Sequence, residues 1–532
     1  MQKESKWMNI VWHGMPFLAL AVWGALCISN QLWYDEAFSA GLVMQPWGKL
    51  IRITAVDDHS PFYYAVLKVF YQILQAGFGL ASREVPLGAC KLLSLLFMMG
   101  YMLLGKYYVA RLFDRRISVY FMVLSLLSPL VCVQAGNVRM YAMALFFWTL
   151  TALLACDLYR AESRRKWILF VYASVCVVYC HTFAMIETVW LYVLFGAALL
   201  ASRQYGKVKR FLISGAVVSV AFSPWLAVTV RQMQLRMRDD VGSVEKLAGP
   251  EEIRAYFLEW CSALETPVEA VMWVVLGVWL FLFGVALVRM RRTKEYTPVV
   301  GTAAFVLTAL TGFLVSALWN NCFLGRYAFP GFGGLLLTGA VGLAELIQRA
   351  EQRANGYTEL TQRPEQSADG DTVQSANRRT RQRADGQIAR RALARNVVAC
   401  GLLAVLACCF AVQYRLELQL EYDGGLAQYE AFWQEHVQEG DVWVAPHGHA
   451  VFLSVYHPAA HYYLNGYVPA DLSFPNLEAC YDIGRLVREH GGAWYITFAG
   501  STPEDAEEGL CYEERARFHY MYYDFVIYHL SD

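Results

Sequence analysis

The chain has 532 residues and a formal net charge of zero, and 57% of its residues are hydrophobic against only 17% charged. This apolar excess over an ordinary soluble protein predicts several membrane spans. The charge balance excludes an ordinary nucleic-acid binder, because such a protein needs a concentrated basic face and the arginines here fall in short clusters between apolar runs. The first apolar run is long enough to span and no small-residue cleavage site follows it, so we expect no cleavable signal peptide.

Apolar runs long enough to cross about 30 Å of hydrocarbon recur along the chain. They lie near 10–30, 87–105, 117–134, 138–158, 167–180, 183–201, 211–228, 268–288, 299–318, 327–347 and 396–413. We therefore predict an all-α membrane protein with about eleven transmembrane helices. Every second loop is rich in Lys and Arg, which the positive-inside rule places in the cytoplasm. The amino terminus is thus predicted inside and the carboxyl terminus outside.

The first external loop is predicted to run from 30 to 86, and its segment 60–79 is apolar and aromatic with Lys68 inside it. Counting 60–79 as a span would place the next basic cluster on the wrong side. We therefore interpret it as a helix along the outer membrane interface. A second external loop, 229–265, has mixed charge and either covers an active site or is simply solvated.

The rest of the chain divides into three further parts after a membrane module at 1–347. Residues 348–395 are rich in Gln, Arg, Asp, Ser and Ala and show almost no aliphatic periodicity. Such a segment cannot bury enough apolar surface to order itself, which predicts a disordered, Arg-rich cytoplasmic linker. A last span is predicted at 396–414, and an extracytoplasmic domain at 415–532.

The domain at 415–532 shows short strand-like and helix-like stretches in alternation, which favours a small α/β fold. The strand-like runs are 441–445, 493–498 and 519–529, and the helix-like stretches lie near 426–438 and 478–490. Its Cys480 and Cys511 either form a disulfide, if the domain is outside the cytosol, or are two unlinked thiols. Its many aromatic residues either recognise an acceptor glycan or form the core of the domain.

An acidic pair, Asp35-Glu36, directly follows the first apolar run. Carboxylates at the mouth of a membrane helix are costly unless solvated or paired, so the pair is a candidate functional site by default. Asp35 suits a general base, because partial burial raises the pKa of a carboxylate and Trp33 and Tyr34 limit its solvation. The alternative is that the pair caps the helix that follows.

A second cluster, Asp57-Asp58-His59, lies about twenty residues further on and precedes Pro61, which would start the interfacial helix. Three interpretations stay open. The cluster binds a divalent metal near Asp58 and His59, although consecutive residues seldom all face one ion. Alternatively, it caps and solvates the loop, or it positions the sugar or the acceptor.

Two arginines, each close to a tyrosine, lie at the outer ends of predicted spans: Arg139 with Tyr141, and Arg326 with Tyr327. Each arginine is either an interface anchor that extends towards water or a phosphate clamp, for which the planar guanidinium is well shaped. Two such sites on one face favour an anionic lipid head group as the ligand. His181, at the turn between two spans, either is a satisfied hydrogen-bonding residue or belongs to the same site.

Taken in order, the segments WYDEAFSA, DDHSPFYY, NVRMYAMAL, YCHTFA and FLGRYAFPG resemble the multispan glycosyltransferases of the GT-C fold. The similar families are the bacterial protein O-mannosyltransferases, the aminoarabinose transferases and the Rhizobium lipopolysaccharide core transferase domain, over roughly residues 10–345. The resemblance implies transfer of a sugar from a polyprenyl-phosphate donor on the outer face, with inversion of the anomeric carbon. It also implies that Asp35 deprotonates the acceptor hydroxyl and that Glu36 orients it.

The same resemblance assigns roles to the other candidates. Arg139 and Arg326 would neutralise charge on the departing phosphate as it develops. Asp58 and His59 match the family's later acidic element, which commonly ends His-Pro-Pro and here reads His-Ser-Pro.

We therefore predict an integral glycosyltransferase of the cell membrane, with a polyprenyl-phosphate sugar as donor and a glycan, lipid or protein as acceptor. A nucleotide-sugar enzyme would be expected to have a soluble nucleotide-binding domain, which the sequence does not indicate. Three other classes stay open. An oligosaccharide polymerase or ligase would differ in whether its donor carries one sugar or many. A transporter or flippase for lipid-linked sugars would not need an external base, and an inactive relative would use its external domain only to bind a glycan.

Overall fold

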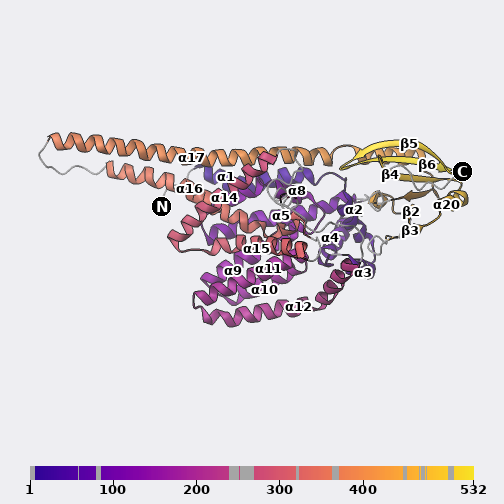
Figure 1. The fold of residues 1–532 in the computed structure, drawn as a ribbon, viewed down its shortest axis with the longest axis horizontal. Coiled ribbons are helices and arrows are strands. Elements are labelled where there is room, and N and C mark those ends of the chain that lie inside the picture. Colours follow the sequence, from indigo (N-terminus) through magenta and orange to yellow (C-terminus); the bar gives the residue numbers. More distant parts are fainter. Residues whose placement is uncertain are drawn as a thin grey trace.

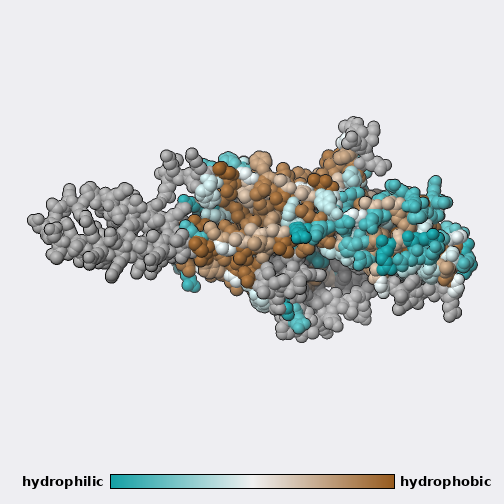
Figure 2. Space-filling view, turned by 90° about the horizontal axis from the view of Figure 1, so that it is seen from above, coloured by the Kyte–Doolittle hydropathy of each residue, from teal (hydrophilic) through white to brown (hydrophobic). Residues whose placement is uncertain are grey.

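The computed structural model describes most of the chain. The described residues are 6–57, 59–79, 85–238, 251, 254, 269–318, 323–361, 371–446, 452–466, 468, 474, 476–500 and 509–532. Helices form a long bundle with a small sheet at one end (Figure 1). Apolar side chains such as Val220 and Leu280 are exposed on the bundle, whereas hydrophilic surface gathers at the end that carries the sheet (Figure 2).

Nine helices of the described part are long and apolar enough to cross a membrane, or ten if one bent pair counts as a single span. The bundle contains α1 (Lys6–Leu26), α5 (Lys91–Leu103), α7 (Arg115–Leu126), α8 (Pro129–Gly136), α9 (Tyr141–Arg160), α10 (Arg164–Val178), α11 (Thr182–Ala201), α12 (Tyr205–Arg238), α14 (Glu269–Thr293), α15 (Thr297–Leu318), α16 (Phe332–Thr361) and α17 (Asp371–Glu421). Between α5 and α7 the chain continues through η2 (Leu104–Val109) and α6 (Ala110–Leu112). The protein is thus a multi-pass membrane protein.

The count differs from the predicted eleven at two places. Helix α10 has 15 residues, about 22 Å at the usual rise per residue, which is short for a span. The run predicted at 117–134 is broken into α7 and α8, which meet at an angle of 69°. The break has a local cause: Ser128 accepts a hydrogen bond from the Val131 N–H, and Pro129 starts the new helix.

The first external loop folds into α2 (Tyr34–Met44), α3 (Trp47–Val56), α4 (Phe62–Gly79) and η1 (Leu87–Cys90). The helix predicted at 60–79 is therefore present, and its placement along the interface stays a prediction. Lys68 of α4 is buried and donates hydrogen bonds of 2.7 Å to the carbonyl oxygens of Val43 and Gln45. This lysine ties α4 to the C-terminal end of α2.

The linker predicted as disordered at 348–395 is helical where the structure describes it, through the ends of α16 and α17. Figure 1 shows these two helices extending together beyond the rest of the bundle. The prediction of disorder was based on the lack of apolar periodicity in residues 348–395. The segment is nevertheless rich in Ala, Arg and Gln, which are strong helix formers with or without an apolar face.

The C-terminal part is an α/β domain, as predicted, with a six-stranded sheet in the order β3-β2-β1-β4-β6-β5. Its elements are α18 (Gly425–His436), β1 (Val442–Ala445), η4 (Phe452–Tyr456), β2 (His461–Asn465), β3 (Leu477–Cys480), α20 (Ile483–His490), β4 (Ala493–Phe498), β5 (Cys511–Tyr520) and β6 (Tyr523–Ser531). Strands β1 to β4 pair in parallel, and β6 pairs antiparallel with β4 and β5. The run predicted as one strand at 519–529 is in fact the turn of the β5–β6 hairpin and most of β6.

The two candidate disulfide cysteines lie on opposite edges of this sheet. Cys480 is on β3 and Cys511 is on β5, five strand spacings away. At about 4.8 Å per spacing the strands are separated by about 24 Å. A disulfide needs Cα atoms within about 7 Å, so the arrangement excludes this bond.

Candidate active site

The acidic pair begins helix α2, and its two carboxylates have different environments. Glu36 is buried, and it accepts hydrogen bonds from the main-chain N–H groups of Trp33 (3.1 Å) and Val138 (2.7 Å). Burial raises the pKa of Glu36 to about 7, although the nearby Lys91 ammonium lowers it. Asp35 keeps 24% of its side chain exposed. Glu36 therefore holds the backbone, both as a cap and across to residue 138, and Asp35 is the carboxylate open to a substrate.

Arg139 joins the candidates of the first loop. Its side chain is only 6% exposed, and its Nε lies 3.8 Å from Asp35 Oδ2. Its Nη1 lies 3.3 Å from the Tyr64 hydroxyl and 3.4 Å from the Asp35 carbonyl oxygen, and its Nη2 lies 3.3 Å from His59 Nε2. The guanidinium is thus buried among polar partners, so the alternative of an interface anchor extending towards water is wrong.

His59 occupies the other side of Arg139. Its Nδ1 lies 3.0 Å from Asp57 Oδ2. Because a guanidinium can only donate, the partners assign Nε2 as the acceptor and Nδ1–H as the donor to Asp57. Gln232 of α12 fixes this segment by donating its amide to the carbonyl oxygens of Thr54 and Asp57.

The predicted divalent-metal site near Asp58 and His59 stays a prediction, because Asp58 lies outside the described residues. Within the described ranges, no group of three His, Cys, Asp or Glu side chains could hold an ion. Both ring nitrogens of His59 already have partners in this arrangement.

His181 connects the two arginine sites. It caps α11, with Nδ1 accepting the Phe183 N–H at 3.2 Å, and its ring centroid lies 5.7 Å from His59, 5.8 Å from Tyr141 and 5.0 Å from Tyr327. Burial, then the charges of His59, Arg139 and Arg326, lower the pKa of His181 well below its usual value. The ring therefore stays neutral.

The second arginine site is carried by η3 (Gly325–Gly331), which precedes α16. The Arg326 guanidinium hydrogen-bonds to the Tyr141 hydroxyl at the start of α9. Every predicted site residue that the structure describes thus belongs to one cluster: Asp35, Asp57, His59, Arg139, Tyr141, His181, Arg326 and Tyr327, with Glu36 fixing the backbone behind it.

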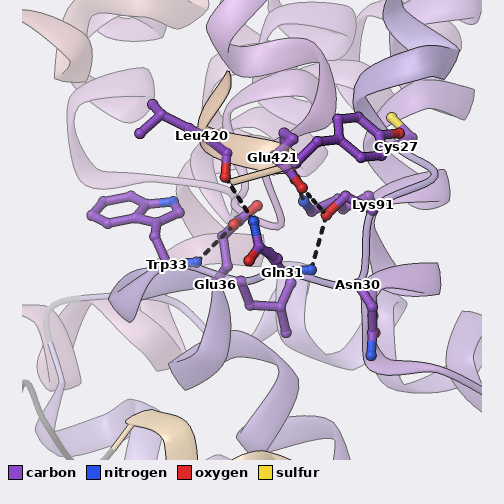
Figure 3. A network of polar contacts seen from close by, with 12 residues as sticks. Cys27, Asn30, Gln31, Trp33, Glu36, Lys91, Leu420 and Glu421 are labelled. Carbon is purple, nitrogen blue, oxygen red and sulfur yellow. Dashed lines mark hydrogen bonds and ion pairs between the residues drawn. The ribbon is translucent and has the colours of Figure 1, made fainter. Parts of the chain in front are cut away.

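A buried network that the sequence analysis missed lies behind this cluster (Figure 3). Lys91 is fully buried and pairs with Glu421, the last residue of α17. Ser29 donates to the Glu421 carbonyl oxygen (2.7 Å), and Gln31 donates to the Leu420 carbonyl oxygen (2.7 Å). The segment that leads into Asp35 is therefore bonded to the end of a helix from the far end of the chain.

The α/β domain holds the same segment. The Tyr520 hydroxyl donates to the Leu32 carbonyl oxygen (2.8 Å) and accepts the Leu32 N–H (2.9 Å). The Tyr456 hydroxyl donates to the Asn30 carbonyl oxygen (2.9 Å). Of the residues in this network and in the α/β domain contacts, only Lys91 could have been recognised from the sequence, because it is a lone cation inside an apolar run.

At one end of the apolar bundle lie a buried arginine, Arg139, a half-buried arginine, Arg326, and a partly open carboxylate, with a small α/β domain over that end. The chain has the GT-C fold of membrane glycosyltransferases, as predicted. The particular similarity is to ArnT from Cupriavidus metallidurans in the apo state, with a TM-score of 0.61 and 14% identity over 96% of this chain and 97% of that chain. The structure of ArnT bound to undecaprenyl phosphate gives a TM-score of 0.58 and 15% identity over the same shares. No protein-family model and no curated protein matches the sequence.

Proposed function

We propose that the chain is a glycosyltransferase that moves a sugar from a polyprenyl-phosphate donor to an acceptor hydroxyl, with inversion at the anomeric carbon. The observation that carries the proposal is the partly exposed Asp35 carboxylate beside the buried Arg139 and close to a second arginine site. A hydroxyl nucleophile needs a base, and a lipid-phosphate leaving group needs cations. The shared fold with ArnT, which has been solved bound to undecaprenyl phosphate, supports this donor class.

In this mechanism Asp35 takes the proton of the acceptor hydroxyl while the hydroxyl oxygen attacks the anomeric carbon. The bond from that carbon to the phosphate oxygen breaks, and polyprenyl phosphate leaves with the electron pair. Arg326 is the cation proposed to meet the developing phosphate charge. Arg139 positions the base, because its Nε lies 3.8 Å from Asp35 Oδ2 and its Nη1 lies 3.4 Å from the Asp35 carbonyl oxygen.

The topology completes the proposal. The basic loops support a cytoplasmic amino terminus, and the residues of the cluster would then face the outside of the cell membrane. His59, itself held by Asp57, would then hold the Arg139 guanidinium, and the α/β domain would cover the site from the aqueous side.

The test uses purified protein with a panel of polyprenyl-phosphate monosaccharides and follows the release of polyprenyl phosphate. Asp35→Asn should lower turnover by about 10²–10⁴-fold, the usual contribution of a general base, while donor binding persists. Asp524→Asn, which removes an exposed carboxylate paired with His519, is the control and should keep wild-type turnover. A lipid-linked sugar that crosses the membrane at an equal rate in Asp35→Asn, without cleavage, would instead establish a transporter.

A further inference from the structure

The turn of the β5–β6 hairpin reaches the proposed base. The Tyr522 ring lies edge-on to Trp33, which precedes the acidic pair, with the centroids 6.3 Å apart at 77°. Burial and the nearby Asp35 carboxylate both raise the pKa of Tyr523. On the other flank, the Tyr34 ring lies 6.2 Å from Phe452 of η4. Residues about 490 positions away in sequence therefore form one wall beside Asp35.

Tyr522 does not belong to the aromatic core of its domain. Tyr429, Trp443 and Tyr462 of that domain are buried, which explains most of its aromatic content. Tyr522 is instead 53% exposed, although it stands next to a site. Its neighbour Tyr523 is held in place by a stacked contact with Phe498, whose centroid is 4.9 Å away.

The turn has a conformation that must be held. Met521 has φ of 53°, in the left-handed region that residues other than glycine rarely adopt. Its N–H donates to Asp423 Oδ2 at 2.5 Å, and Asp423 Oδ1 accepts the Gly425 N–H at 2.7 Å. The Tyr520 hydroxyl bonds to both the N–H and the carbonyl oxygen of Leu32. Asp423 and Tyr520 together therefore fix the position of the turn relative to Asp35.

We propose that Trp33 and Tyr522 form the acceptor subsite, where a saccharide ring of the acceptor lies against the aromatic faces and presents its hydroxyl to Asp35. This inference rests on the proposed function and assigns its acceptor class. The Tyr522 ring is more than half exposed and lies against Trp33, two residues before the partly open Asp35 carboxylate. The apolar face of a saccharide ring can pack on an exposed aromatic ring while its hydroxyl groups stay polar. A saccharide acceptor therefore suits this wall and brings a hydroxyl to Asp35, whereas an acyl chain has no hydroxyl to bring.

The orientation of Trp33 fits the same role. Its Nε1 donates to Asn137 Oδ1 at 3.3 Å, which fixes the indole plane. Asn137 is two residues before Arg139, so the aromatic wall and the arginine share one short segment. The backbone segment 137–139 would therefore position both the acceptor, through Asn137 and Trp33, and the Arg139 guanidinium beside Asp35.

The test measures transfer in lipid nanodiscs from polyprenyl-phosphate monosaccharides to two acceptor probes, octyl glucoside and a serine- and threonine-containing peptide. Wild type should transfer to the glycoside. Tyr522→Ala should raise the KM for the glycoside about tenfold, with turnover at saturation and the slow hydrolysis of the donor by water unchanged. Tyr522→Phe and Tyr522→Trp should restore the wild-type KM, since both keep an aromatic face.

Tyr481→Ala is the matched control, because Tyr481 is a tyrosine of the same domain that is 75% exposed. It should leave all values unchanged. An unchanged glycoside KM in Tyr522→Ala, or transfer only to the peptide, would overturn the acceptor subsite while leaving the transferase in place. Wild-type protein that neither transfers nor hydrolyses any donor would instead overturn the proposed function itself.

Discussion

The buried ion pair between Lys91 and Glu421 allows folding and positioning to be measured separately. Lys91→Met would leave Glu421 uncompensated, with the Glu36 carboxylate close by. Removing one partner of a buried pair costs about 3–5 kcal/mol of folding free energy. Replacing both partners, Lys91→Met with Glu421→Leu, removes the charges together and is often close to neutral. We therefore expect the double variant to be more stable than either single variant.

The effect of the double variant on turnover should differ from its effect on stability. The double variant keeps the bonds from Ser29 and Gln31, because these end on main-chain oxygens of Glu421 and Leu420. It loses the side-chain link between α5 and α17, so the segment before Asp35 is held less firmly. A shift of about 1 Å at a reacting group can cost about 100-fold, so turnover should fall between tenfold and 100-fold. The KM for the donor should not change, because both arginines keep their contacts.

The assay combines thermal unfolding of the purified protein with steady-state turnover for the two single variants and the double variant. The exposed pair Arg485 and Glu489 on α20 is the control, and removing it should change stability by no more than about 0.5 kcal/mol. Destabilisation of the double variant equal to the sum of the single variants would refute the energetic coupling. A stable double variant with wild-type turnover would refute the positioning role.

Two further predictions follow from the geometry of the site. The pKa of Glu36 is about 7 in the folded protein against an ordinary 4.5, so the folded state holds the proton more tightly and the stabilisation is lost as pH rises through 7. Glu36 should therefore contribute a fall in unfolding temperature between pH 5 and 8 equivalent to about 3 kcal/mol, and Glu36→Gln should reduce the slope by that amount; an unchanged slope in the variant contradicts the assignment. Arg139→Lys keeps the charge but cannot reach Asp35, Tyr64 and His59 together, so turnover should fall about 100-fold with donor binding retained, and unimpaired turnover would show that the forked geometry is not needed.

The features that can be recognised from the sequence are local ones. The acidic pair, the two Arg-Tyr sites and the apolar runs can each be recognised within a window of about twenty residues. Their convergence is not local, because Arg139 and His59 are 80 residues apart and meet only when α9 packs beside the first external loop. The resemblance to a known fold supplied this convergence, which composition and periodicity could not have given.

The errors have equally specific causes. Strand β5 carries Glu513, Glu514, Arg515 and Arg517, and it is mostly exposed, so it lacks the alternation that identifies a half-buried strand. The hairpin turn then has Met521, not glycine, in its left-handed position, because Asp423 supplies the missing local preference from another element. A signal that depends on a residue about 100 positions away cannot be read from the turn itself.

The segment that carries the proposed base, Asp35, is held by bonds that depend on few of the side chains around it. The segment from Ser29 to Glu36 is fixed through its main chain or through the main chain of its partners: Tyr520 bonds to Leu32, Gln31 to Leu420, and Glu36 to Val138. A main-chain group is present whatever side chain occupies the position. Substitutions at Leu32, Leu420 or Val138 would therefore leave these bonds in place, so the position of Asp35 should tolerate change at these three sites.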